Sequence, residues 1–159
     1  MKKILVLLAA AVLSLGAANN ANAQKLSDNF CTIGLHTGAY TGDLGLGLNL
    51  DFNAGNWRGR LLLDGANLFN EAPTYFAPAV DFHYVINLVA GLDIYPIVGV
   101  NGYISTSKND PFNLGLDLGA GLQYRFTDKF SLFAEGKYQY MIINPGKHYQ
   151  GLFGFAFAL

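Results

Sequence analysis

The sequence predicts an all-β fold in which eight strands run up and down and close into an antiparallel barrel. Large apolar residues alternate with small or polar ones in eight successive segments, and only turn-like connections separate these segments. The last segment, 149–159, aims bulky side chains to one face, and a strand there needs a partner on both edges, which a closed barrel provides. That face carries Tyr149, Gly151, Phe153, Phe155, Phe157 and Leu159.

The composition of the chain restricts its class. Of the 159 residues, 52% are hydrophobic and 13% charged, which is too apolar for disorder and too poor in charge for an ordinary soluble surface. Beyond the first residues no apolar run reaches the ~18 residues of a membrane helix, so the chain can cross a bilayer only as strands. A formal charge of −1 without a basic patch argues against nucleic acid as a partner. The single cysteine, Cys31, excludes an internal disulfide.

The first residues have the pattern of a secretory signal peptide. Lys2 and Lys3 give a positive start, an apolar core follows over 4–15, and Ala21-Asn22-Ala23 supplies a small-x-small cleavage pattern. We therefore expect a signal peptide at 1–23 and a barrel at 24–159. No cysteine follows the cleavage site, so we do not expect a lipoprotein.

The first four strands follow one another closely. Segments 30–40, 44–52 and 57–66 alternate at period two and are separated by turns rich in Gly, Asn and Asp. A fourth segment, at about 77–87, follows a polar connection. Pro78 is expected near the start of this strand or in a bulge, because proline cannot donate a hydrogen bond to a neighbouring strand.

The last four strands include the clearest pattern in the chain. Residues 87–92 leave the start of the fifth strand open, and Pro96 within it predicts a bulge or irregular pairing. The sixth strand, 113–126, alternates without an error, and 130–140 and the closing segment complete the barrel.

The connections differ in length in the way expected of a membrane barrel. If both ends of the chain lie on the periplasmic side, the connections at 53–56, 87–91 and 127–129 lie there too and are short. The external connections at 67–76, 105–112 and 141–148 are then longer, and the 41–43 turn is a short exception.

The polar face of the strands predicts which side of the wall faces inward. It is rich in glycine and carries charges of nearly balanced sign, which can pair in a narrow lumen, whereas the leucine-rich face suits lipid. Asp51 and His36 share the polar face. The charge network expected in the lumen consists of Arg58, Arg60, Asp64, Asp81, His83, Asp117, Arg125, Glu135 and Lys137.

Aromatic residues near the strand ends predict two belts at the membrane interfaces. The periplasmic belt is expected to contain Phe52, Trp57, Phe126 and Phe130. The external belt is expected to contain Tyr40, Tyr75, Tyr103, Phe112, Tyr140 and Tyr149.

The final strand resembles a known signal. Gly154-Phe155-Ala156-Phe157-Ala158-Leu159 resembles the assembly signal of bacterial outer-membrane barrels, although that family usually ends on an aromatic residue and this chain has Leu159. Over the mature chain, the pattern resembles small eight-stranded outer-membrane proteins of the OmpA-like, porin-family barrel class. The resemblance implies the outer membrane of a Gram-negative cell, contact with its lipid, and recognition by the barrel-assembly machinery through Gly154, Phe155, Phe157 and Leu159. We expect a monomer without a cofactor.

Four functions compete at this point. An eight-stranded barrel is narrow enough for its side chains to fill, so a structural or surface-interaction protein with a salt-bridged plug is the first hypothesis. A narrow channel for ions or small solutes is the second, since the same charges would line it. A soluble periplasmic barrel that binds an apolar ligand ranks low, because it needs the leucine face inside.

A lipid-modifying enzyme is the remaining hypothesis, and the histidines test it. His36 and His83 are expected in the lumen, and Asp81 shares the face of His83, but no serine is placed to form a nucleophile–base pair. His148 lies in the last connection. No spacing of metal ligands or phosphate-binding glycine loop occurs, so we expect no catalytic or metal site.

Overall fold

The computed structural model describes residues 30–40, 42–67, 74–106 and 112–159. The expected signal peptide therefore lies outside the described residues. Among the described residues, no helix has the length and apolarity needed to cross a bilayer. The strands there are β1 (Cys31–Tyr40), β2 (Asp43–Ala54), β3 (Trp57–Ala66), β4 (Tyr75–Tyr84), β5 (Ile86–Val89), β6 (Leu92–Ser105), β7 (Phe112–Arg125), β8 (Phe130–Met141) and β9 (Gly146–Ala158).

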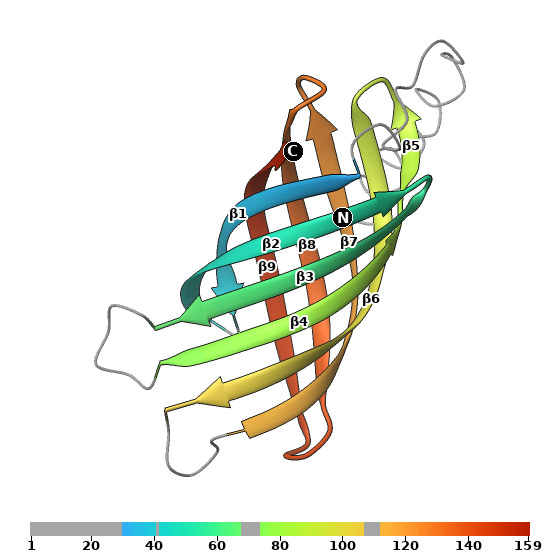
Figure 1. The fold of residues 1–159 in the computed structure, drawn as a ribbon. Coiled ribbons are helices and arrows are strands. Elements are labelled where there is room, and N and C mark those ends of the chain that lie inside the picture. Colours follow the sequence, from blue (N-terminus) through green and yellow to red (C-terminus); the bar gives the residue numbers. More distant parts are fainter. Residues whose placement is uncertain (1–29, 41, 68–73, 107–111) are drawn as a thin grey trace, which may run out of the picture.

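The strands close into one antiparallel barrel (Figure 1). Their order is β4-β3-β2-β1-β9-β8-β7-β6-β5, and an additional pairing of β4 with β6 joins the two edges. The short strand β5 continues β4 along the same partner, β6, so the two count as one bent strand. The predicted eight-stranded up-and-down barrel is confirmed.

The seam between β4 and β6 is interrupted twice, and a proline lies at each interruption. The register of the flanking pairs places Pro78 opposite Gly102 and Pro96 opposite Tyr84. Neither pair is formed, although the register is the same on both sides of each gap. Proline has no N–H to donate, so each one removes a hydrogen bond from this seam. The irregular pairing expected at Pro96 is confirmed, whereas the bulge lies farther along, between Asn87 and Val89.

The connections gather at two ends of the barrel. We call the end at which β1, β3, β6 and β8 end and β2, β4, β7 and β9 begin the loop end, and the opposite end, with the connections 55–56, 90–91 and 126–129, the terminal end. The long last connection predicted at 141–148 is wrong. Met141 pairs with Gly146, and His148 with Gln139, so the hairpin extends and only four residues remain in the turn.

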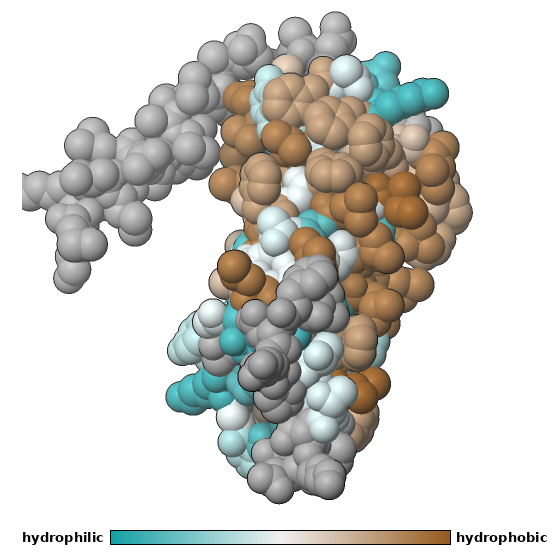
Figure 2. Space-filling view, turned by 90° about the vertical axis from the view of Figure 1, so that its left-hand side faces the viewer, coloured by the Kyte–Doolittle hydropathy of each residue, from teal (hydrophilic) through white to brown (hydrophobic). Residues whose placement is uncertain are grey.

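The two faces of the wall differ as the alternation predicts. Along β7, the side chains of Leu116 and Leu118 are 48% and 58% exposed, whereas Asp117 between them is 1% exposed. Large apolar side chains cover the outside of the barrel on every strand, and Figure 2 shows them spread over much of one face. The leucine-rich face is therefore the outer wall, and the polar face lines the lumen.

The predicted aromatic belts hold only in part. Phe112, Tyr140 and Tyr149 are exposed on the outer wall near the loop end, as are Phe52, Trp57 and Phe126 near the terminal end, where Phe130 is half-buried. The placement of Tyr40, Tyr75 and Tyr103 in the outer belt is wrong. These three lie on the inward phase of their strands, and Tyr40 and Tyr75 are only 5% and 6% exposed.

Candidate functional site

The polar lumen is the candidate site, because it gathers nearly all the buried charge of the described residues. Eight of the nine residues predicted to line it have buried side chains, and the ninth, Arg125, is partly exposed at the terminal end. Each comes from an inward position of its strand, where neighbouring residues alternate with the apolar outer wall.

Arg60 on β3 is the centre of the largest cluster. Its Nε and Nη2 donate to the two carboxylate oxygens of Asp51 on the neighbouring strand, at 2.6 and 2.8 Å. Its Nη1 donates to Glu135 on β8, across the lumen, and the guanidinium lies 4.8 Å from the ring of Phe133. Tyr95 also donates to Glu135, at 2.8 Å. One cation thus joins two carboxylates on opposite walls.

Lys137 on β8 forms a second cluster. Its Nζ donates to Asp81 on β4 at 2.7 Å and lies 4.0 Å from a carboxylate oxygen of Asp117 on β7. Asn101 on β6 donates to Asp117. Side chains from three strands therefore meet at one buried ammonium group, and Asn101 links a fourth strand to it through Asp117.

His36 on β1 lies in a third cluster, nearer the loop end. Its Nε2 is 2.5 Å from Asp64 Oδ1, and its Nδ1 is 3.3 Å from Asn49 Oδ1. Gln150 on β9 donates to the other oxygen of Asp64 at 2.7 Å. A Cβ at Gly47 would overlap both the His36 ring and the Asp64 carboxylate, so this pair requires glycine beside it.

Arg58 and His83 contact mainly neutral groups, although Arg58 Nε also lies 3.7 Å from a carboxylate oxygen of Asp51. Arg58 donates to Gln123 on β7 at 2.6 Å and to Asn53 at 3.1 Å, and its guanidinium lies 5.1 Å from the Tyr95 ring. His83 stacks on Tyr95, with ring centroids 4.9 Å apart and an interplanar angle of 14°. The ring contact of His83 is thus aromatic, although Arg58 lies opposite it on β3.

Arg125 belongs to a separate pair near the terminal end. Its partner is Asp93 on β6, with 3.2 Å between Arg125 Nε and Asp93 Oδ2. Asn87 donates to the same carboxylate at 2.5 Å. Asp93 was missed because the sequence left the start of this strand open at 87–92. Asp93 lies two residues before Tyr95, so both side chains are on the same face of the strand, and this spacing could have predicted that Asp93 points into the lumen.

Apolar side chains fill the lumen toward the loop end. Tyr40, Leu62, Ala66, Tyr75, Ala79 and Leu152 form one buried cluster, and Tyr103 packs against it. Tyr75 donates to the backbone carbonyl of Tyr40, and its ring lies 4.8 Å from that of Tyr103. We call these residues the tyrosine cluster. It covers the charged part of the lumen on that side.

Among the described residues, no group of three or more His, Cys, Asp or Glu side chains is arranged to hold a metal ion. Several of these side chains are instead paired within the lumen, as in His36–Asp64 and Lys137–Asp81. The arrangement of the lumen thus pairs buried cationic and anionic side chains across its width.

A scan against protein-family models and a search of curated proteins both find no match. Solved structures are similar. The N-terminal β-barrel domain of Pseudomonas aeruginosa OprF matches with 19% identity and a TM-score of 0.67, over 81% of this chain and 96% of that chain. A major outer membrane protein from Thermus thermophilus matches with 14% identity and a TM-score of 0.61, over 81% and 98%. Neisserial surface protein A matches with 10% identity and a TM-score of 0.60, over 80% and 94%.

These likenesses define the fold, which is that of the small bacterial outer-membrane β-barrels. The resemblance inferred from the sequence is confirmed at this level. A closed barrel satisfies its backbone groups internally, and this one presents an apolar wall outward, so it is built for contact with lipid.

Proposed function

We propose that the protein is a non-enzymatic barrel of the bacterial outer membrane, with a structural or surface-interaction role and a lumen plugged by ion pairs. The contact of Arg60 with Glu135 carries this proposal. Strands β3 and β8 lie on opposite sides of the eight-stranded barrel, so the pair crosses the full width of the lumen. A barrel of this size has an interior that side chains can fill.

Other contacts support the plug at several levels. Gln150 binds Asp64 and Lys137 binds Asp81, each between strands that are not neighbours in the sheet. The tyrosine cluster adds an apolar layer toward the loop end, where a hydrophobic constriction opposes the passage of water and ions.

Planar bilayers test the plug. We expect folded wild-type protein to show no steady conductance, because the ion pairs and the tyrosine cluster block the lumen in series. The double variant Arg60→Ala/Tyr75→Ala removes one group from each layer and should conduct, whereas Lys129→Ala, in an exposed turn, should not. Steady current through the wild type would refute the plug.

A narrow cation channel is the second candidate, and one observation favours it. Asp81 Oδ1, Asn101 Oδ1 and Glu135 Oε2 are buried without a hydrogen-bond partner, and such acceptors usually bind water. The lumen of the described residues also holds more carboxylates than cations. Wild-type current that prefers cations and falls in Glu135→Gln would establish the channel in place of the plug.

The histidines support a non-enzymatic role. Both ring nitrogens of His36 contact side chains, those of Asp64 and Asn49. His83 is stacked on Tyr95, and the ring of His148 lies against Tyr103. These are the ion-pair and packing contacts of structural histidines.

For assembly, we propose that the barrel-assembly machinery recognises β9 through Gly154, Phe155, Phe157 and Leu159, and that the folded protein is a monomer. Phe155, Phe157 and Leu159 are 37%, 45% and 77% exposed on the outer wall, where a partner can read them. Phe157→Asp should slow assembly into outer-membrane vesicles, whereas Phe112→Asp, equally exposed on β7, should slow it less. Equal rates would contradict recognition through β9.

The surface role is proposed for the loop end. Two of the predicted external loops lie partly outside the described residues, at 68–73 and 107–111.

A further inference from the structure

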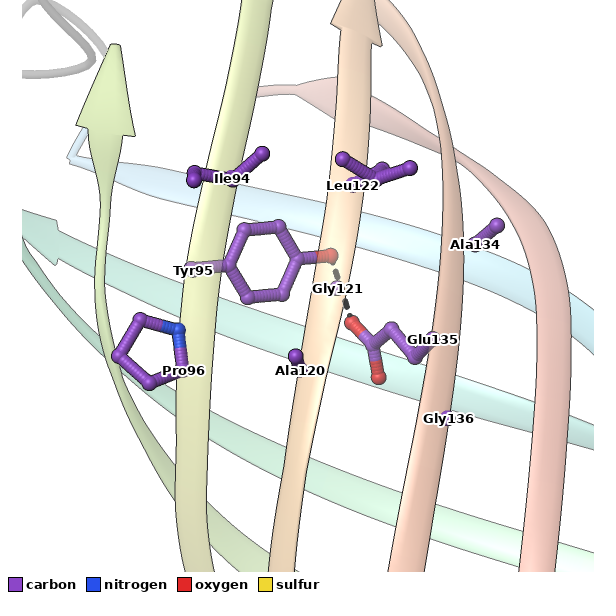
Figure 3. A pocket seen from close by; sticks show the side chains of 9 residues that line it. All are labelled: Ile94, Tyr95, Pro96, Ala120, Gly121, Leu122, Ala134, Glu135 and Gly136. Carbon is purple, nitrogen blue, oxygen red and sulfur yellow. Dashed lines mark hydrogen bonds between the residues drawn. The ribbon is translucent and has the colours of Figure 1, made fainter. Parts of the chain in front are cut away.

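A hollow of about 640 Å³ lies in the outer wall across β6, β7 and β8 (Figure 3). Two adjacent rows of outward-facing residues form it, and each row takes one residue from each strand. The register pairs Pro96 with Ala120 and Ala120 with Gly136 in one row. The other row consists of Ile94, Leu122 and Ala134. Four of these six side chains are Pro, Ala or Gly, so the wall is thin here.

Larger residues surround the hollow. The next row toward the loop end consists of Val98, Leu118 and Tyr138, and the next row toward the terminal end of Leu92, Tyr124 and Leu132. A Cβ added at Gly136 would meet no atom within 4 Å, so the space above this glycine is open. The result is a concave site with bulky rims on an otherwise convex barrel.

The hollow is closed toward the lumen. Tyr95 and Glu135 also line it, but their side chains are buried and joined by the 2.8 Å hydrogen bond drawn in Figure 3. The Tyr95 ring covers Gly121, where an added Cβ would overlap it. An occupant therefore has to come from the side of the outer wall.

We propose that this hollow binds one acyl chain of a membrane lipid. The hollow is continuous with the outer wall, which faces hydrocarbon, and its outward-facing side chains are all apolar. A chain seated there contacts the floor and both rims, and so it gains more dispersion contacts than a chain on the convex wall. The volume falls within the range of about 300–1,000 Å³ typical of ligand sites. A second barrel would present a convex wall, which meets the rims before it reaches the floor.

Photolabelling by lipid tests this site, which rests on the proposed position in a bilayer. The protein is reconstituted in phosphatidylethanolamine vesicles containing a little phosphatidylcholine with a diazirine in the middle of one acyl chain, and the labelled residues are mapped. We expect several-fold more label at Ile94, Leu122 and Ala134 than at Leu61 and Leu63, which are exposed on β3.

Two glycine variants provide a matched comparison. Gly136→Leu fills the hollow and should lower its labelling several-fold. Gly59→Leu places the same side chain at an outward position of β3, where a Cβ also meets nothing within 4 Å, and should leave the labelling of the hollow unchanged. If Gly136→Leu does not show the heat-dependent gel shift of a folded barrel, Ala120→Leu replaces it.

Several outcomes would overturn the site. Uniform label over the outer wall, or equal labelling of the hollow in wild type and Gly136→Leu, would show that no chain is held there. Crosslinks between two copies through Ile94 or Leu122 would assign the hollow to self-association. If the protein does not insert into the bilayer at all, the result is different. No residue would then be labelled, and no variant would show a heat-dependent gel shift.

Discussion

Replacing Arg60 with methionine tests the centre of the lumen, because it removes the cation and keeps an unbranched side chain. Arg60 is 1% exposed, and its loss leaves Glu135 and Asp51 buried with fewer partners. Asp51 would keep Arg58, at 3.7 Å. Removing one partner of a buried ion pair costs about 3–5 kcal/mol, and we expect Arg60→Met to lower the free energy of unfolding by that amount.

Urea unfolding in phospholipid vesicles, followed by Trp57 fluorescence and by the heat-dependent gel shift, measures this loss. Lys129→Met is the matched control, since it removes a cation from an exposed turn, and it should change the free energy of unfolding by less than about 0.5 kcal/mol.

A double-mutant cycle with Glu135→Gln isolates the contact across the lumen. The glutamine keeps the size of the side chain and an acceptor for Tyr95 but removes the charge. We expect Arg60→Met and Glu135→Gln to couple by about 0.5–3 kcal/mol, as residues in contact do. A coupling near zero, or a loss in Arg60→Met as small as in Lys129→Met, would refute the reasoning.

Three further predictions concern the β4–β6 seam, Gly47 and the expected signal peptide. Backbone amides in the β4–β6 seam should exchange hydrogen faster than those between β7 and β8, because two prolines interrupt the first ladder; equal protection would contradict this. Gly47→Ala should lower the free energy of unfolding by about 1–3 kcal/mol through overlap with the His36–Asp64 pair, against under about 0.5 kcal/mol for Gly59→Ala, where the space is open, and similar losses would be evidence against it. N-terminal sequencing of the protein isolated from membranes should begin at Gln24, and a start at Met1 would exclude cleavage.

The sequence predicted which side chains face outward on most strands. A strand of a membrane barrel has only two faces, and the face in contact with lipid has to be apolar. The alternation over 113–126 placed Asp117 inside and Leu118 outside, and the exposures follow it. The prolines were also informative, because a residue without an N–H cannot donate a hydrogen bond to the neighbouring strand. Pro96 does lie at an interruption of the strand pairing.

The errors arose where residue type was followed in place of the phase of the strand. Tyr40, Tyr75 and Tyr103 were placed in an outer belt because tyrosine suits an interface, but each lies on the inward phase and packs in the lumen. The last connection was predicted too long, because Gly146 and His148 look like loop residues and yet pair with β8.

The contacts inside the lumen were beyond the sequence. Alternation shows that Arg60 and Glu135 face inward, but not that they meet, because this depends on which strands are opposite and on their stagger. The same holds for the contact of Arg58 with Gln123 on β7, whereas its other partner, Asn53, lies directly opposite it on the neighbouring strand β2. Only closure of the barrel brings Arg60 to Glu135 and Arg58 to Gln123.

Spin labels along β7 test most directly the claim that lipid is outside and the polar network inside. Single cysteines are introduced one at a time from 114 to 122 in a Cys31→Ser background, labelled with a nitroxide in vesicles, and their accessibility to oxygen is measured. The structure predicts high accessibility at Leu114, Leu116, Leu118, Ala120 and Leu122, and low accessibility at the positions between them. The opposite phase would place the leucines inside, as in a soluble ligand-binding barrel, and a profile without alternation would contradict the barrel wall itself.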